Sequence, residues 1–118
     1  NLNNFKSFKI LKHLEDKKYQ SAYYCFSLIL NNKVKNKREQ IIKNLNNMSL
    51  GTSIYYPKPV PLLKYYKKKY GFNEKNFKNS KIISENSICL PIGPHLSIKD
   101  IKVIIKILTK VFKNYETK

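Results

Sequence analysis

The most informative stretch of this chain is Gly51-Thr52-Ser53-Ile54-Tyr55-Tyr56-Pro57-Lys58-Pro59-Val60-Pro61. Its three alternate prolines fix φ and push the residue before each of them into extended or polyproline geometry. A second run follows further along the chain, Ser87-Ile88-Cys89-Leu90-Pro91-Ile92-Gly93-Pro94-His95-Leu96. A rigid loop that carries adjacent tyrosines is costly to specify, so we interpret the two runs together as the functional part of the chain.

Length and composition indicate one compact domain. The chain has 118 residues, and its 42% hydrophobic content is ordinary for a globular core. Its longest apolar run, residues 22–30, is strand length and falls short of the roughly twenty residues that a membrane helix needs. The polar, Asn-rich N-terminus lacks the apolar segment of a signal peptide, which predicts a cytoplasmic protein without a membrane partner. Because the first residue is Asn1 and the only methionine is Met48, we expect the chain to begin inside a longer protein.

The formal net charge of +17 raises the alternative of a stand-alone basic α+β module that binds nucleic acid or another polyanion. Against this, Lys, Asn and Ile are abundant together, as AT-rich coding produces, and Arg38 is the only arginine. Proteins that bind nucleic acid rely on arginine for bidentate contacts with bases and phosphates. Apart from Lys67-Lys68-Lys69 the lysines are scattered. A solvated basic surface is therefore favoured, and nucleic acid is not expected as a partner.

The two cysteines, Cys25 and Cys89, each lie in an apolar, strand-like run. In a chain without a secretory signal they are expected to be small, reduced core residues. A disulfide between them is the alternative if their strands are neighbours. Neither His13 nor His95 combines with these cysteines at a zinc-site spacing, so no metal site is expected.

Apolar spacing predicts the elements of the first half of the chain. Residues 3–16 repeat apolar side chains at helical spacing, which predicts an amphipathic helix. Residues 22–30 are aromatic and β-favouring with apolar residues on both faces, which predicts a strand buried on both sides. Residues 35–48 form a second helix with one apolar stripe and a solvated charged face.

The second half follows the same alternation. We expect, in order, a short strand over 52–56, helices over 62–70 and 75–86, and a strand over 87–90. A final helix begins after Ser97, where Asp100 completes a capping box. The predicted fold class is α+β, with a short, mainly antiparallel sheet and helices packed on it.

No set of residues in the sequence is sufficient for catalysis, since it lacks a nucleophile elbow, a phosphate-binding loop and a zinc-protease motif. Tyr55 and Tyr56 occupy consecutive strand positions, so their rings are expected on opposite faces, one in the core and one free to contact a substrate. Packing of both rings is the alternative. His95, just before a helix start, could contact a phosphate or only fix the turn.

Two segments resemble the DegT/StrS-type sugar aminotransferases. Ser49–Pro59 is similar to the family's Gly-Ile-Gly-Thr-x-x-His/Tyr-Tyr-Pro-x-Pro segment. Phe77–Leu96 is similar to its Phe-Pro-x-Ala … Ile-Ser … Ser-Ile-x-Leu-Pro-x-Gly-Pro-x-Leu segment. The resemblance covers nearly the whole chain. Tyr55 stands where many members carry histidine, and Pro61 where many carry the histidine of a Pro-Leu-His run, so the sugar accepted could differ.

The resemblance implies a fold-type-I enzyme dependent on pyridoxal 5'-phosphate (PLP). It would transfer an amino group, with glutamate the expected donor, to a nucleotide-linked keto-sugar for polysaccharide biosynthesis. Residues 1–118 would be its small C-terminal domain, with the cofactor domain and Schiff-base lysine upstream, so these residues alone are not expected to be catalytic. The small domain would close part of the active site and help hold the substrate, and a homodimer would complete that site. The substrate-binding candidates are Tyr55, Tyr56, Lys58 and His95.

Two alternatives stand beside this interpretation. The polyanion-binding module is kept open by Tyr65-Tyr66-Lys67-Lys68-Lys69-Tyr70, and a steep fall of affinity with salt would mark it. On a helix, however, that run favours a packed aromatic side and a solvated lysine side. The other alternative is a free-standing remnant that only folds or dimerises. The isolated domain is also expected to expose apolar side chains and to self-associate.

Overall fold

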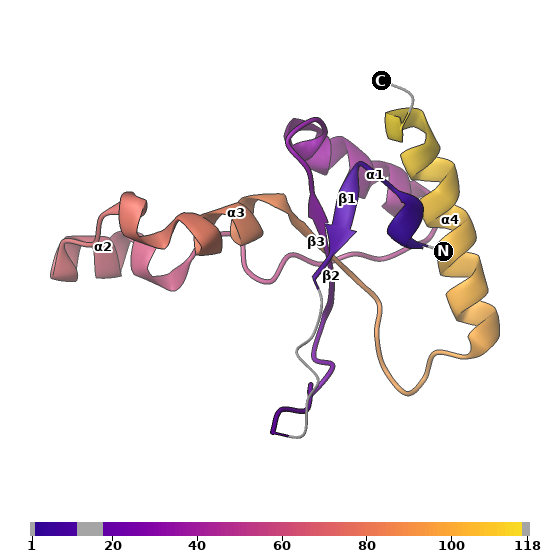
Figure 1. Ribbon diagram of the computed structural model, residues 1–118, viewed down its shortest axis with the longest axis horizontal. Helices are drawn as coiled ribbons and strands as arrows, with labels where there is room; N and C mark the ends of the chain where they lie inside the picture. Colours follow the sequence, from indigo (N-terminus) through magenta and orange to yellow (C-terminus); the bar gives the residue numbers. More distant parts are fainter. Residues whose placement is uncertain (1, 12–17, 117–118) are drawn as a thin grey trace.

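A three-stranded antiparallel sheet forms the centre of the computed structural model, which describes residues 2–11 and 18–116 (Figure 1). The sheet order is β1-β2-β3, with β1 at Phe8–Ile10, β2 at Phe26–Leu30 and β3 at Ser87–Leu90. Phe8 lies opposite Leu30 in the first pairing, and Ser27 lies opposite Cys89 in the second. The predicted α+β class is confirmed.

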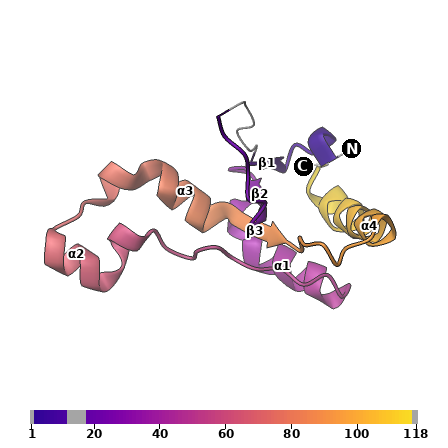
Figure 2. The same cartoon turned by 90° about the horizontal axis from the view of Figure 1, so that it is seen from below.

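Residues 2–11 and 18–116 contain four α-helices: α1 at Arg38–Asn47, α2 at Lys64–Tyr70, α3 at Lys78–Asn86 and α4 at Ile98–Glu116. Short 3-10 helices are η1 at Leu2–Asn4, η2 at Lys35–Lys37, η3 at Val60–Leu62 and η4 at Glu74–Phe77. Helices α1 and α4 pack with the sheet, whereas residues 60–86 extend away from it on the side opposite α4 (Figures 1 and 2). We call residues 60–86 the arm. Within the described residues, the helices are too short or too polar to cross a membrane.

The core lies between the sheet, α1 and α4. Helix α4 contributes Leu108 and Phe112, and the Phe112 ring meets the Phe8 ring edge-on with 4.7 Å between centroids. The predicted capping box at the start of α4 is confirmed. The Asp100 carboxylate accepts a hydrogen bond from the Ser97 backbone N–H at 2.8 Å, and the Ser97 hydroxyl accepts one from the Asp100 N–H at 3.2 Å.

The predicted helix over 3–16 is wrong for the residues that the structure describes, because η1 is followed by β1. Phe8 is buried and Lys9 is exposed, which is the alternation of a strand. The segment is held from the far end of the chain: the Glu116 carboxylate accepts hydrogen bonds from the Lys6 N–H at 2.8 Å and the Ser7 N–H at 2.9 Å. The Ser7 hydroxyl also donates to it. Residues 12–16 of the predicted helix lie outside the described residues.

Two predicted strands are shorter than expected. The strand predicted over 22–30 begins only at Phe26, and Tyr24 before it is exposed, because β3 ends at the pairing partner of Phe26. The strand predicted over 52–56 is reduced to one bridge, between Ser53 and Cys89. Burial of the remaining part of β2 agrees with the prediction, since residues 27–30 are buried.

The arm contains both predicted helices, with shifted starts. Helix α2 ends at Gly71, whose φ of 65° favours glycine, and η4 takes the first turn of the helix expected over 75–86. The Tyr66 ring stacks on the Tyr70 ring within α2. Both rings remain exposed, because nothing in the described chain covers α2, so the packed aromatic side expected there does not form in the described chain.

Candidate functional site

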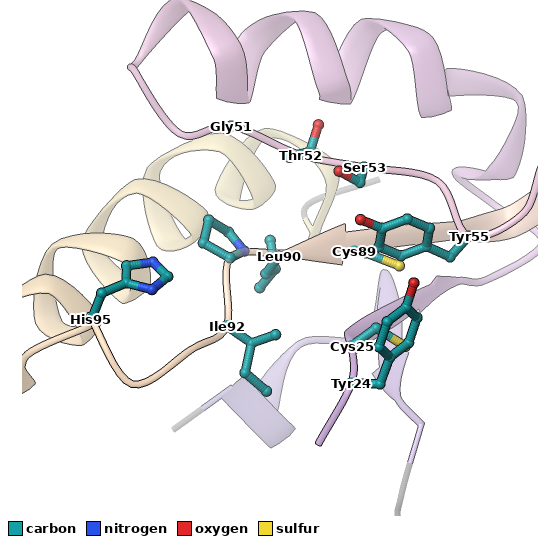
Figure 3. A pocket seen from close by; sticks show the side chains of 11 residues that line it. Tyr24, Cys25, Gly51, Thr52, Ser53, Tyr55, Cys89, Leu90, Ile92 and His95 are labelled. Carbon is teal, nitrogen blue, oxygen red and sulfur yellow. The ribbon is translucent and has the colours of Figure 1, made fainter. Parts of the chain in front are cut away.

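A cleft of about 380 Å³ opens beside the outer edge of β3 (Figure 3). Its walls come from both sequence runs described above and from the residues that precede β2. It is lined by Tyr24, Cys25, Gly51, Thr52, Ser53, Tyr55, Cys89, Leu90, Pro91, Ile92 and His95.

The Gly51–Tyr55 segment is fixed to the sheet at one residue. The Ser53 N–H donates to the Cys89 carbonyl at 3.0 Å, and the Cys89 N–H donates to the Ser53 carbonyl at 2.8 Å. Beside this bridge the Thr52 Oγ1 atom is buried without a hydrogen-bond partner among the described residues. The bridge therefore sets the position of one cleft wall.

Tyrosines form one end of the cleft. The Tyr24 and Tyr55 ring centroids lie 5.7 Å apart, and so do those of Tyr55 and Tyr56. A hydrogen bond with the Tyr56 side chain raises the pKa of Tyr24 above its ordinary value, and the nearby Tyr56 and Tyr55 charges add to this. The prediction that Tyr55 and Tyr56 face opposite sides is wrong, because the segment leaves the sheet after Ser53 and does not keep strand geometry. Both rings are exposed, so the alternative of two packed rings is also wrong.

His95 lies at the other end of the cleft, in the loop between β3 and α4 (Figure 3). Its imidazole lies against Gly93, where an added Cβ would come within 2.7 Å of two ring atoms. Gly93 has a φ of 156°, so the backbone geometry favours glycine there, and a larger residue would also have to displace the His95 ring. Hydrogen bonds from the Ser97 hydroxyl and N–H lower the pKa of Asp100, and His95 contributes to the same shift.

The structure brings two of the four predicted site residues into the cleft. Tyr55 and His95 line it, Tyr56 lies beside Tyr55 without lining it, and Lys58 is exposed outside it. Tyr24 is the main residue that sequence reasoning missed. Its position directly before a buried strand was the available signal, but the strand was expected to include it.

The two cysteines face the same cleft and are free. Cys89 is buried and Cys25 is half-buried. The Ser27 hydroxyl lies between them, 3.5 Å from the Cys25 sulfur and 3.3 Å from the Cys89 sulfur. Within the described residues, no three His, Cys, Asp or Glu side chains gather in a way that could hold a metal ion.

Comparison with known protein families identifies the family of this chain. The model of the DegT/DnrJ/EryC1/StrS aminotransferase family matches residues 1–109. The chain belongs to this family. The resemblance drawn from its two motifs is therefore confirmed.

Two curated proteins are similar to this chain in sequence. The uncharacterized protein MJ1066 of Methanocaldococcus jannaschii is 27% identical over 96 residues, covering 80% of this chain and 25% of that protein. The spore coat polysaccharide biosynthesis protein SpsC of Bacillus subtilis is 27% identical over 77 residues, covering 65% of this chain and 20% of that protein. The chain thus spans a quarter or less of the length of these curated relatives.

Solved structures agree with the fold. PseC of Helicobacter pylori, an aminotransferase involved in the biosynthesis of pseudoaminic acid, matches with a TM-score of 0.80 at 19% identity, over 96% of this chain and 29% of that one. The PLP-form of Spr1654 from Streptococcus pneumoniae, designated a sugar aminotransferase, matches with a TM-score of 0.73 at 26% identity. That match covers 92% of this chain and 27% of the other.

Proposed function

We propose that this chain is the small C-terminal domain of a PLP-dependent aminotransferase that transfers an amino group from glutamate to a nucleotide-linked keto-sugar. The observation that carries the proposal is the cleft, whose walls are built from the two segments that resemble the sugar aminotransferases. Family membership and the sugar-related names of several relatives support the substrate class. A homodimer of the complete protein belongs to the same proposal, and the cytoplasmic location stays a prediction.

The cleft residues do not fit as the seat of the cofactor. PLP requires a lysine amine for its Schiff base and a partner for its pyridine nitrogen, usually aspartate or arginine. Among the residues that the structure describes, the lining of the cleft contains no lysine, arginine or carboxylate. Our proposal therefore assigns the cofactor to a part of the protein outside residues 1–118, and gives this chain a role in holding and enclosing substrate.

The chemistry of the lining suits a hydroxyl-rich, anionic ligand. The Tyr24 and Tyr55 hydroxyls can each donate or accept a hydrogen bond, and their exposed rings offer apolar surface to a sugar. His95 lies in the loop before α4, and its imidazole N–H can donate a hydrogen bond to a phosphate oxygen. We assign the tyrosines to the sugar and His95 to the phosphate end.

The test uses the complete reading frame that contains these residues. The purified protein is expected to show a visible aldimine band with PLP, which glutamate bleaches and a nucleotide-linked keto-sugar restores. Tyr55→Phe removes one hydroxyl, worth about 1 kcal/mol, and should raise KM for the keto-sugar roughly fivefold. Tyr65→Phe, on the arm, is the matched control and should leave KM unchanged. A protein without the band would refute the aminotransferase proposal, and equal KM values would refute the role of Tyr55.

The exposed lysines of the arm favour a second candidate function, which is binding of nucleic acid or another polyanion. All seven side chains of α2 are exposed, including four lysines, which suits a polyanion. The Lys69 ammonium, however, lies 5.5 Å and 5.3 Å from the Tyr65 and Tyr70 ring centroids, so part of this surface is occupied by internal contacts. A titration with single-stranded DNA at two salt concentrations tests it. Binding that weakens steeply with salt supports this function, and no binding at low salt removes it.

A further inference from the structure

A disulfide between Cys25 and Cys89 requires that their two strands be neighbours. The structure meets this requirement, because β2 and β3 are hydrogen-bonded to each other. Cys89 belongs to β3, and Cys25 directly precedes the first residue of β2. Both line the cleft, yet neither has a role in the function proposed above.

The register places the two thiols close together. The N–H and carbonyl of Cys89 point toward Ser53, so Cys89 and Ser27 form the non-hydrogen-bonded type of cross-strand pair, in which side chains lie closest. Cys25 is two residues from Ser27 and lies on the same face. Since each sulfur is within 3.5 Å of the Ser27 hydroxyl, the two sulfurs lie within about 7 Å of each other.

Closing that gap requires a small movement at one residue. Diagonal cross-strand neighbours have Cα atoms about 7–8 Å apart, whereas a disulfide needs about 4.4–6.8 Å. Cys25 lies outside the strand ladder, so it can approach Cys89 without breaking a β2–β3 hydrogen bond. The same movement displaces Tyr24, whose ring contacts Tyr55 at the cleft mouth.

We propose that Cys25 and Cys89 form a reversible dithiol–disulfide site whose oxidised form rearranges the tyrosine end of the cleft. The oxidant is a low-molecular-weight disulfide such as oxidised glutathione. The thiolate of Cys25, the more accessible thiol, attacks one glutathione sulfur, and the other glutathione leaves as a thiolate. The Cys89 thiolate then attacks the Cys25 sulfur and expels the second glutathione. Two protein thiols lose two electrons and two protons, and the glutathione disulfide gains them.

The first experiment counts thiols and measures intact mass after treatment with oxidised glutathione. We expect the chain to lose both titratable thiols, to lose the mass of two hydrogen atoms, to form no disulfide-linked dimer and to retain no glutathione. Dithiothreitol should restore both thiols. A stable glutathione adduct on the unsubstituted chain, two unreacted thiols or a disulfide-linked dimer would overturn the proposal.

Matched variants separate the role of Cys25, which attacks glutathione disulfide, from that of Cys89, which attacks Cys25. Cys89→Ser lacks the resolving thiol and should keep one glutathione on Cys25. Cys25→Ser should keep the buried Cys89 thiol unmodified over the same period. Equal modification of the two variants would contradict the assigned order of attack. The result on the unsubstituted chain decides the proposal even if a variant fails to fold.

The second experiment compares backbone amide spectra of the reduced and oxidised chain. Oxidation should shift the amide resonances near residues 23–25 and 51–55 and leave those of α2, at the far end of the arm, unchanged. Disulfide formation without shifts at 23–25 would overturn the rearrangement.

Discussion

Replacement of Glu116 by glutamine tests how the two ends of the domain hold each other. The carboxylate accepts from the Lys6 N–H through Oε2 and from the Ser7 N–H and hydroxyl through Oε1. Glutamine keeps the size of the side chain but has one acceptor oxygen, so its amide N–H₂ must face a backbone donor. Because Ser7 is only 2% exposed, the single glutamine oxygen should stay on the two Ser7 donors, and the Lys6 N–H loses its acceptor.

The magnitude follows from these contacts. A hydrogen bond to a charged group is worth about 1.5–3 kcal/mol, and because Glu116 is partly exposed we take about 2 kcal/mol. An unfolding entropy of about 2.1 cal/mol/K per residue gives about 0.25 kcal/mol/K for the 118-residue chain. Glu116→Gln should therefore lower Tm by about 8 °C at neutral pH.

The pH dependence has a definite sign. Burial alone would raise the pKa of Glu116, but hydrogen bonds from the Ser7 hydroxyl and the Lys6 and Ser7 N–H groups outweigh it and lower the pKa. The stabilisation is complete above the unfolded-state pKa of about 4.3. It is lost as the pH falls through the lowered folded-state pKa.

Thermal unfolding followed by circular dichroism between pH 7 and pH 2 measures both effects. Glu39→Gln, at an exposed position of α1, is the matched control and should leave Tm within about 2 °C of the parent value. The difference between Glu116→Gln and the parent chain should shrink at the acidic end. A Tm unchanged at pH 7, or a difference that persists undiminished at pH 2, would refute the reasoning.

Three further substitutions test the site and the core. Ser97→Ala removes the hydroxyl that caps α4 and should cost about 1 kcal/mol in urea unfolding; an unchanged midpoint would contradict the cap. Gly93→Ala places a Cβ against the His95 ring, 2.7 Å away, and should shift the imidazole proton resonances, while unchanged resonances would mean that the ring does not lie there. Phe112→Ala empties a fully buried position and should cost about 3–5 kcal/mol, a large part of the stability of a small domain, whereas Lys113→Ala beside it should cost little.

The sequence predicted helix ends correctly where neighbouring residues alone determine the backbone geometry. Ser97 and Asp100 predicted the start of α4 because a capping box needs only neighbouring residues. Gly71 likewise marked the end of α2, since its positive φ is a local requirement. Leu108 and Phe112 of α4 lie fully buried, whereas Ile98 and Ile101 near its start are exposed.

The errors occurred where distant parts of the chain decide the structure. Phe5 and Phe8 fit a helical repeat as well as a strand. Residues far along the chain make β1 a strand: Leu30 pairs with Phe8, and the Glu116 carboxylate accepts hydrogen bonds from the residues just before β1. The extent of β2 depends on where β1 and β3 end, so Tyr24 could not be placed from its own neighbours. The cleft combines residues from three separate segments, which motif spacing alone does not bring together.

The bridge between Ser53 and Cys89 has a consequence for association of the domain. β3 is an edge strand, and unpaired edges offer backbone donors and acceptors to other chains. The Gly51–Tyr55 segment occupies that edge with two hydrogen bonds and simultaneously forms a cleft wall. A substitution that loosens this wall to admit a larger ligand would also uncover the edge, so a broader binding range and resistance to aggregation are in conflict at this one position.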